Sequence, residues 1–181
     1  MTTHEYDVVV VGAGTAGCYA AASAARDGLD VVVVERKDEQ EAGHIACGDA
    51  LKGADTFPEA IPKSRIEDSF TNTGVDHGRF ELPQHDTVLD IPVPGELAVI
   101  DRYAFGRRII EGAEAAGADF HYDTVVQDVL QDGARITGVR GTRKGDPVTY
   151  EAAVTVDAAG ALSILQDKTD FSDTHFDTNV S

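Results

Sequence analysis

The first 35 residues constrain the fold of this chain most, because they contain every part of one supersecondary unit in order. An apolar run of β-branched residues at positions 6–11 predicts a buried strand. It leads directly into a glycine-rich turn at 12–17 and then into an alanine-rich helical segment. A second apolar strand, residues 31–34, ends at Glu35. This succession within about 30 residues predicts a dinucleotide-binding βαβ unit.

A physical reason explains each glycine in this turn. Gly12 allows the sharp turn from strand to helix, and Gly14 lets the backbone approach a pyrophosphate with no Cβ in the way. Gly17 lets the helix lie close to the strands, and the helix N-terminus offers free N–H groups to phosphates. Glu35 stands where a carboxylate can accept both ribose hydroxyl protons. An acid there favours a free 2′-hydroxyl, so we do not expect an NADP site.

The net charge of the chain indicates the salt conditions to which it is adapted and excludes one class of partner. Its 32 acidic and 15 basic residues give a formal net charge of −17 over 181 residues. The acids are spread along the chain, which favours adaptation to high salt over a merely acidic surface, because salt screens their repulsion. Such a surface repels nucleic acid, so we expect no nucleic-acid partner.

Cysteine and hydropathy patterns indicate the compartment. Cys18 and Cys47 cannot form a disulfide framework, which favours a reducing cytoplasm. The N-terminus lacks the basic-then-apolar pattern of a signal peptide, and no apolar run approaches the ~20 residues that span a bilayer. Contact with the inner surface of the membrane stays open. The histidines show no metal-ligand spacing, so no metal is expected.

The rest of the chain predicts an α/β domain over residues 1–160 with two β-rich parts. Residues 57–96 are punctuated by prolines and predict an irregular or β insertion, with short strands near 79–82 and 87–91. A strand at 97–100 precedes a helix from Arg102 to about Gly117, with Asp101 as N-cap.

A strand at 119–122, a β-meander at about 125–150 and a buried strand at 153–156 follow that helix. The order of elements predicts a Rossmann-like α/β fold with a mostly parallel sheet and an inserted antiparallel meander. Asp157 to Gly160 end the last strand in a small-residue turn.

Together these motifs resemble the flavoprotein oxidoreductases of the para-hydroxybenzoate-hydroxylase-like fold. Within them the chain is most similar to the archaeal geranylgeranyl reductase family, which saturates prenyl chains of membrane lipids with FAD. The marks of the resemblance are the turn at 12–17 with Glu35, the segment Cys47-Gly48-Asp49-Ala50, the helix start at 101–107, and residues 157–160.

The resemblance implies a set of cofactor-binding residues. It places Ala16 with Gly12, Gly14 and Gly17 at the pyrophosphate, Glu35 at the adenosine ribose, and Cys47, Gly48 and Ala50 beside the flavin. It also places Arg102 at the phosphates and the backbone of Val126 at the adenine. Arg36, Asp157 and Gly160 complete the implied FAD site. A cation at a helix start opposes the helix dipole, which independently suggests an anion near Arg102.

The resemblance implies reduction of carbon–carbon double bonds in geranylgeranyl lipids, with Cys47 as the candidate proton donor. The partners would be a prenyl-lipid substrate and an electron donor of unknown identity. Family members are about twice this length, so residues 161–181 would begin a substrate domain that is cut short. The chain is then a truncated product, a fragment or half of a split enzyme.

Two other functions stay open. The chain could be a non-catalytic FAD-binding module that needs a complementing chain or associates with itself. It could also belong to an FAD-dependent aromatic hydroxylase, which shares the fold.

Overall fold

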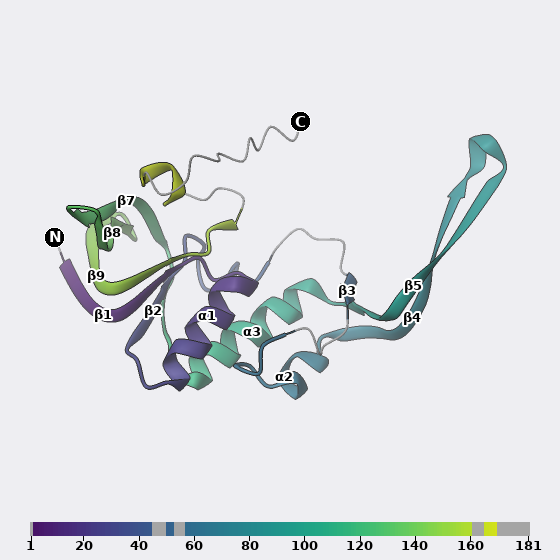
Figure 1. Ribbon diagram of the computed structural model, residues 1–181, viewed down its shortest axis with the longest axis horizontal. Helices are drawn as coiled ribbons and strands as arrows, with labels where there is room; N and C mark the ends of the chain where they lie inside the picture. The colour runs from purple at the N-terminus through teal and green to yellow at the C-terminus, as the bar shows by residue number, and fades with distance from the viewer. Residues whose placement is uncertain (1, 45–49, 53–56, 161–164, 170–181) are drawn as a thin grey trace.

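The computed structural model describes residues 2–44, 50–52, 57–160 and 165–169 (Figure 1). The elements follow in this order: β1 (Thr2–Val11), α1 (Thr15–Arg26), β2 (Val31–Val34), β3 (Ala50–Lys52), α2 (Lys63–Glu67), β4 (Phe70–Leu82), η2 (Pro83–His85), β5 (Thr87–Ile100), α3 (Arg102–Ala116), β6 (Asp119–His121), β7 (Thr124–Asp132), β8 (Arg135–Arg143), β9 (Asp146–Asp157) and η4 (Gln166–Lys168).

The main sheet has the strand order β6-β2-β1-β9-β8-β7. Strands β6, β2, β1 and β9 run parallel, whereas β7, β8 and β9 form an antiparallel meander. This is the predicted Rossmann-like arrangement of parallel strands with an antiparallel meander. Helices α1 and α3 lie on one side of the parallel strands and the meander lies on the other (Figure 1).

The valine runs of β1 and β2 are buried on both faces. Val10 and Val33 pack in the core that includes α1 and α3, whereas Val9 and Val32 pack with meander residues such as Tyr150. All four valines are 0% exposed, and burying such a side chain contributes about 1.5–3 kcal/mol. Burial on both sides explains why these strands read as continuous apolar runs without alternation.

Helix α3 has the predicted start and end. The Asp101 carboxylate accepts a hydrogen bond from the Ala104 N–H at 2.9 Å, as an N-cap does. Gly117 ends the helix in the left-handed region with a φ of 110°. Phe105 and Ile109, four residues apart on one helix face, are buried against the core.

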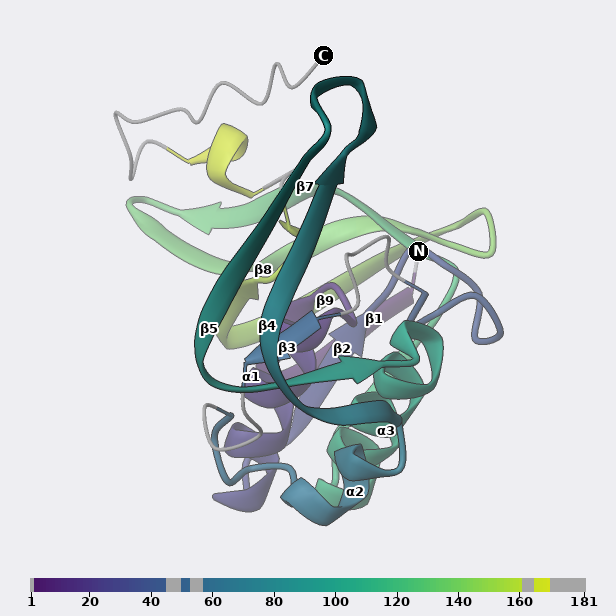
Figure 2. The same cartoon turned by 90° about the vertical axis from the view of Figure 1, so that its right-hand side faces the viewer.

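The segment before α3 is more regular than its sequence predicts. The alternations near 79–82 and 87–91 lie within one long hairpin of β4 and β5, and the expected separate strand at 97–100 is the end of β5. The hairpin projects away from the body of the molecule (Figures 1 and 2). Three register shifts between Phe70 and His77 interrupt the pairing, which is why no clean alternation marks these strands.

The far half of the hairpin is amphipathic. The pairing of Phe80 with Leu89 places Phe80, Leu82, Leu89 and Ile91 on one face, with exposed fractions between 42% and 57%. The other face carries Arg79, Glu81 and Asp90, together with Val88, which is 47% exposed. Within the described residues nothing buries the apolar face. No helix in the described part of the chain is long and apolar enough to cross a bilayer.

Candidate functional site

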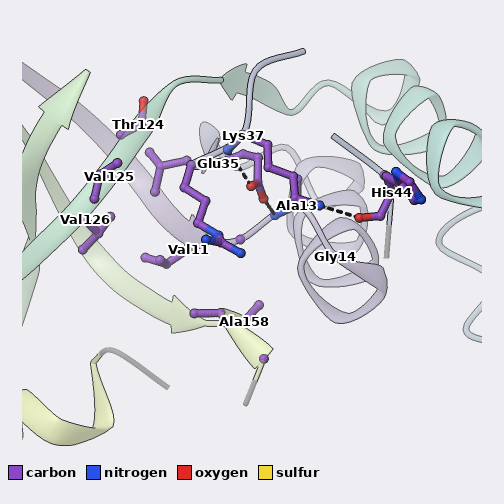
Figure 3. Close-up of a pocket in the computed structure, with 16 residues that line it drawn as sticks. Val11, Ala13, Gly14, Glu35, Lys37, His44, Thr124, Val125, Val126 and Ala158 are labelled. Carbon is purple, nitrogen blue, oxygen red and sulfur yellow. Dashed lines mark hydrogen bonds between the residues drawn. The ribbon is translucent and has the colours of Figure 1, made fainter. Parts of the chain in front are cut away.

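A cavity of about 460 Å³ opens at the carboxyl ends of β1, β2 and β9 (Figure 3). Strand β1 has β2 as its neighbour on one side and β9 as its neighbour on the other, so the strand order reverses at β1. The cavity therefore lies at a topological switch point. Ligands of open α/β sheets bind at such points. The glycine turn, Glu35 and the first residues of β7 form its walls.

Gly12 and Gly17 are required by close backbone contacts. Gly12 has a φ of 104°, and a Cβ built on it would lie 2.6 Å from the Ala158 carbonyl oxygen. A Cβ on Gly17 would lie 1.9 Å from the Gly12 carbonyl oxygen. No side chain fits at either distance, so helix α1 can start against the strand ends only with glycine at both positions.

The N-terminus of α1 is left open toward the cavity side of the turn. Gly14 is the N-cap and lines the cavity, and no side-chain hydrogen bond from the described residues caps the helix. The Cys18 N–H makes the first helical bond, to the Gly14 carbonyl at 3.0 Å. Ala16 is exposed in the first turn, which contains no acid. These features suit an anion at the helix start.

Cys18 has a structural role in this turn. Its side chain is 0% exposed, and its thiol donates to the Ala13 carbonyl oxygen at 3.4 Å. Burial raises the pKa of the Cys18 thiol to about 12, so the group stays neutral and unreactive. Cys18 therefore serves packing at the start of α1.

Glu35 is held by two backbone hydrogen bonds. One carboxylate oxygen accepts from the Ala13 N–H at 2.8 Å and the other from the Lys37 N–H at 2.9 Å (Figure 3). An ionised carboxylate has about four acceptor positions, so two remain for ribose hydroxyls. Arg36 follows at the exposed rim of the cavity.

The opposite wall is the start of β7. Thr124, Val125 and Val126 line the cavity, and Val126 is 6% exposed. The pairing of β7 with β8 shifts register just after Val126. A Cβ on Gly141 of β8 would lie 2.0 Å from the Val125 carbonyl oxygen, so glycine lets β8 approach the backbone of this wall. The structure thus brings Val126 opposite Glu35, in the same cavity.

Arg102 reaches the start of α1 from the start of α3. One guanidinium nitrogen donates to the Thr15 hydroxyl at 3.2 Å, and the guanidinium carbon lies 5.0 Å from the centroid of the Phe105 ring. The Arg102 Nε is buried and has no hydrogen-bond partner among the described residues. A buried donor without a partner, beside an open helix N-terminus, fits a diphosphate.

The structure does not bring every predicted residue to this cavity. Gly160 lines it, but Asp157 lines a second cavity of about 590 Å³ and accepts from the Ala159 and Leu165 N–H groups. Ala50 is exposed at the start of β3, where it pairs with Val99. Cys47 and Gly48 lie outside the described residues.

Several residues of the cavity were not indicated by the sequence, among them two with polar side chains. Lys37 and His44 both line it, and the Lys37 ammonium donates to the His44 carbonyl oxygen. They lie in or just after a charged run at 36–41, which by composition alone is typical of a solvated loop. A basic residue two positions after Glu35 is the signal that could have indicated them.

The fold and the site define a nucleotide-binding α/β domain. The chain belongs to the FAD dependent oxidoreductase family, whose model matches residues 7–166. FAD is therefore its cofactor. The glycine turn, the anchored carboxylate of Glu35 and the unpaired Nε of Arg102 fit the diphosphate and adenosine parts of that molecule.

Curated relatives narrow the family. The digeranylgeranylglycerophospholipid reductase of Methanocella arvoryzae is 33% identical over 88% of this chain and 40% of its own length. That of Haloferax volcanii is 32% identical over 94% and 39%. A probable electron transfer flavoprotein-quinone oxidoreductase of Escherichia coli, YdiS, is 32% identical over 91% and 39%. The resemblance to geranylgeranyl reductases is confirmed, and the chain spans about 40% of the length of these relatives.

Solved structures share the fold. A geranylgeranyl bacteriochlorophyll reductase-like protein from Thermoplasma acidophilum superposes with a TM-score of 0.74 at 23% identity, over 92% of this chain and 42% of its own. The myxobacterial chondrochloren halogenase CndH gives 0.74 at 21% identity, over 91% and 39%. Such different proteins on one fold show that the fold alone does not define the reaction.

Proposed function

We propose that this chain is the FAD-binding part of an oxidoreductase that reduces carbon–carbon double bonds in the geranylgeranyl chains of archaeal membrane lipids. The observation that carries the proposal is the cavity with the anchored Glu35 carboxylate, in a chain whose curated relatives include several digeranylgeranylglycerophospholipid reductases. Its substrate would be a prenyl lipid, and an electron donor would supply the reducing equivalents.

The chain's own residues would hold the cofactor at three places. The open N-terminus of α1, with Gly14 and Arg102, would bind the diphosphate through N–H groups and positive charge. Glu35 would accept the ribose hydroxyl protons, and the backbone at Val126 would contact the adenine. When bound, FAD supplies the hydride for the reduction.

An isolated double bond has no carbonyl to polarise, so a proton donor in a dry pocket would assist the reduction. Cys47 remains our candidate for that donor, and it lies outside the described residues. Replacing Cys47 with serine in the complete enzyme tests the role, and undiminished reduction would remove the thiol from the mechanism.

The setting we propose is the cytoplasm, at the inner surface of the membrane that contains the lipid. The acidic surface argues for high salt and against nucleic acid as a partner.

The experiment that tests the proposal supplies the purified 181-residue chain with FAD, a chemical reductant and digeranylgeranylglycerophospholipid. We expect a yellow protein that retains FAD through gel filtration. Mass spectrometry of the lipid then separates two outcomes. A gain of two hydrogens per double bond supports an active reductase, whereas an unchanged lipid with retained FAD favours a binding module. A colourless protein contradicts the cofactor assignment itself.

The second candidate is that module, which binds FAD and needs a complementing chain for catalysis. The exposed apolar face of the β4–β5 hairpin favours it, because large uncovered apolar surface commonly marks an interaction site. Restored lipid reduction on adding a second polypeptide would support this function.

A further inference from the structure

Lys37 joins three parts of the cofactor site. Its backbone N–H donates to the Glu35 carboxylate at 2.9 Å, and its carbonyl oxygen accepts from the Asp123 N–H at 3.0 Å. Its side-chain ammonium crosses the rim of the cavity to the His44 carbonyl oxygen (Figure 3). Lys37 therefore closes residues 37–44 into a loop whose two end residues, Lys37 and His44, both line the cavity.

The same loop is tied down on helix α3. The Tyr103 hydroxyl donates to the Gln40 carbonyl at 2.8 Å, and the Arg107 guanidinium donates to the Glu39 carbonyl at 2.9 Å. Between these bonds, the backbones meet without side chains, since a Cβ on Gly106 would lie 2.1 Å from the Gly43 carbonyl oxygen. Such ties along one helix face leave the loop little freedom to move.

Helix α3 thus reaches both ends of the nucleotide site. Its first residue, Arg102, bonds to Thr15 at the phosphate turn, and Tyr103 and Arg107 fix the loop that ends at His44. Lys37 is the point at which that loop meets the ribose-binding carboxylate.

From these contacts we propose that Lys37 is a positioning residue that acts through Glu35 to preform the adenosine-binding wall. The inference rests on the proposed FAD site. The ammonium tie to His44 fixes the backbone of Lys37, and its N–H then holds one carboxylate oxygen of Glu35. Without that tie the carboxylate loses one of its two anchors and no longer presents a fixed pair of acceptors to the ribose.

The test measures ADP affinity, because ADP carries the adenosine and diphosphate without the flavin. By calorimetry on the 181-residue chain, Lys37→Met should bind ADP roughly tenfold more weakly than wild type, the effect of losing about one hydrogen bond. Lys37→Arg keeps a cationic donor and should restore most of the affinity. The control is Lys144→Met, which removes the same charge at an exposed turn outside the cavity.

A double-mutant cycle distinguishes positioning from general destabilisation. If Lys37 acts through Glu35, then Lys37→Met should cost little further affinity in a Glu35→Gln background, because the amide already lacks one acceptor. Additive losses, or an unchanged affinity of Lys37→Met, would overturn the inference. Failure of Lys37→Arg to rescue would overturn it as well.

A milder variant keeps the inference testable if Lys37→Met does not fold. Tyr103→Phe removes only the bond to Gln40, and it should weaken ADP binding several-fold with the same non-additivity toward Glu35→Gln. A wild-type chain that binds neither ADP nor FAD would overturn the proposed cofactor site itself. Wild-type binding with unaffected variants would overturn only the role of Lys37.

Discussion

At the scale of single residues, the position of the Glu35 carboxylate is fixed before any ligand binds. Each of its two oxygens accepts a hydrogen bond from a backbone N–H. An acceptor that is held in place loses little conformational freedom on binding, which strengthens each hydrogen bond to the ribose.

Replacing Glu35 with alanine should therefore weaken FAD binding by about 1.5–3 kcal/mol, the usual range for hydrogen bonds to a charged group. Fluorescence titration of FAD measures the loss. Glu151→Ala is the matched control, because it removes an exposed carboxylate from β9 outside the cavity. Equal affinity of Glu35→Ala and wild type would place the ribose elsewhere.

At Gly14 the space beside the backbone matters, because this residue lines the cavity at the start of α1. Gly14→Val should abolish retention of FAD, because a branched side chain would stand where the diphosphate approaches the α1 N-terminus. Absorbance of the purified protein after gel filtration measures retention. Gly78→Val serves as control, since Gly78 lies in strand β4 and the nearest neighbour of its Cβ would be Phe80 at 3.6 Å. A yellow Gly14→Val protein would refute the assignment of the turn.

These residues were predictable because their reasons are local. Gly12, Gly14 and Gly17 lie in one short turn, and Glu35 follows the strand that pairs with β1 in the same βαβ unit, so a local pattern fixes their relative positions. The bond between Arg102 and Thr15 joins residues 87 positions apart, so only the folded chain brings them together. For the same reason the contact between Gly43 and Gly106 could not be inferred from either segment alone.

At the scale of elements, ring side chains from β6, β1 and β9 meet in one cluster, and the His121 carbonyl oxygen accepts a hydrogen bond from the Glu35 N–H. The His121 Nδ1 lies 2.8 Å from the Tyr150 hydroxyl, and the His4 ring lies 5.0 Å from His121 and stacks on Tyr150. Burial, followed by the charges of Arg143 and His4, lowers the pKa of His121 to about 4. The folded protein thus favours the neutral imidazole.

The lowered pKa of His121 makes the free energy of unfolding decrease as the pH falls. The unfolded chain takes up a proton below pH 6.5, whereas the folded chain does not until about pH 4, so stability falls as the pH drops through that window. In denaturant titrations, His121→Gln should remove this part of the fall. His85→Gln, at the exposed hairpin turn, is the control. An identical slope for His121→Gln and wild type would contradict the assignment.

The far half of the β4–β5 hairpin differs from the strands of the main sheet because its apolar side chains are exposed. Two strands alone are marginally stable, and the described residues offer nothing to bury Phe80 and Leu89. Amide hydrogen exchange at residues 78–91 should therefore be much faster than in β1, which is paired on both sides and buried. Equal protection of the two regions in dilute protein would show that the apolar face is covered.

The long strands of this hairpin were also the elements that the sequence predicted least well. Helix α3 has the helical period of one buried face, and the valine runs of β1 and β2 are continuous because both of their faces are buried, so these elements were predicted. In the hairpin neither strand is buried on a core over its far half, and Pro92 lies within β5 opposite His77. Without burial to select the side chains, the sequence shows turn residues and prolines more plainly than it shows strands.

At the scale of the whole molecule, charge is the dominant property. A net charge of −17 on a chain of 181 residues means that compaction brings many carboxylates close together. The few described ion pairs lie at the surface, for example Lys63 with Glu67 and Arg79 with Glu81, and such pairs contribute little. The acids in excess are therefore a source of self-repulsion that the solvent must screen.

The stability of the folded chain should accordingly rise with salt. At 1 M ionic strength the Debye length is about 3 Å, shorter than the spacing of most surface charges, so the repulsion that opposes folding is largely removed. Each kcal/mol of screened repulsion raises Tm by roughly 2–4 °C in a domain of this size. Thermal unfolding followed by circular dichroism, with potassium chloride from low to molar concentration, measures the rise.

The control separates screening from general effects of added solute. Sucrose strengthens burial by exclusion from the surface without screening charge, so it should raise Tm equally in wild type and in a variant with several exposed aspartates changed to asparagine. Potassium chloride should raise Tm less in that variant, because less repulsion is left to screen. If salt raises both proteins equally, or wild type not at all, the acidic surface is not what couples this fold to salt.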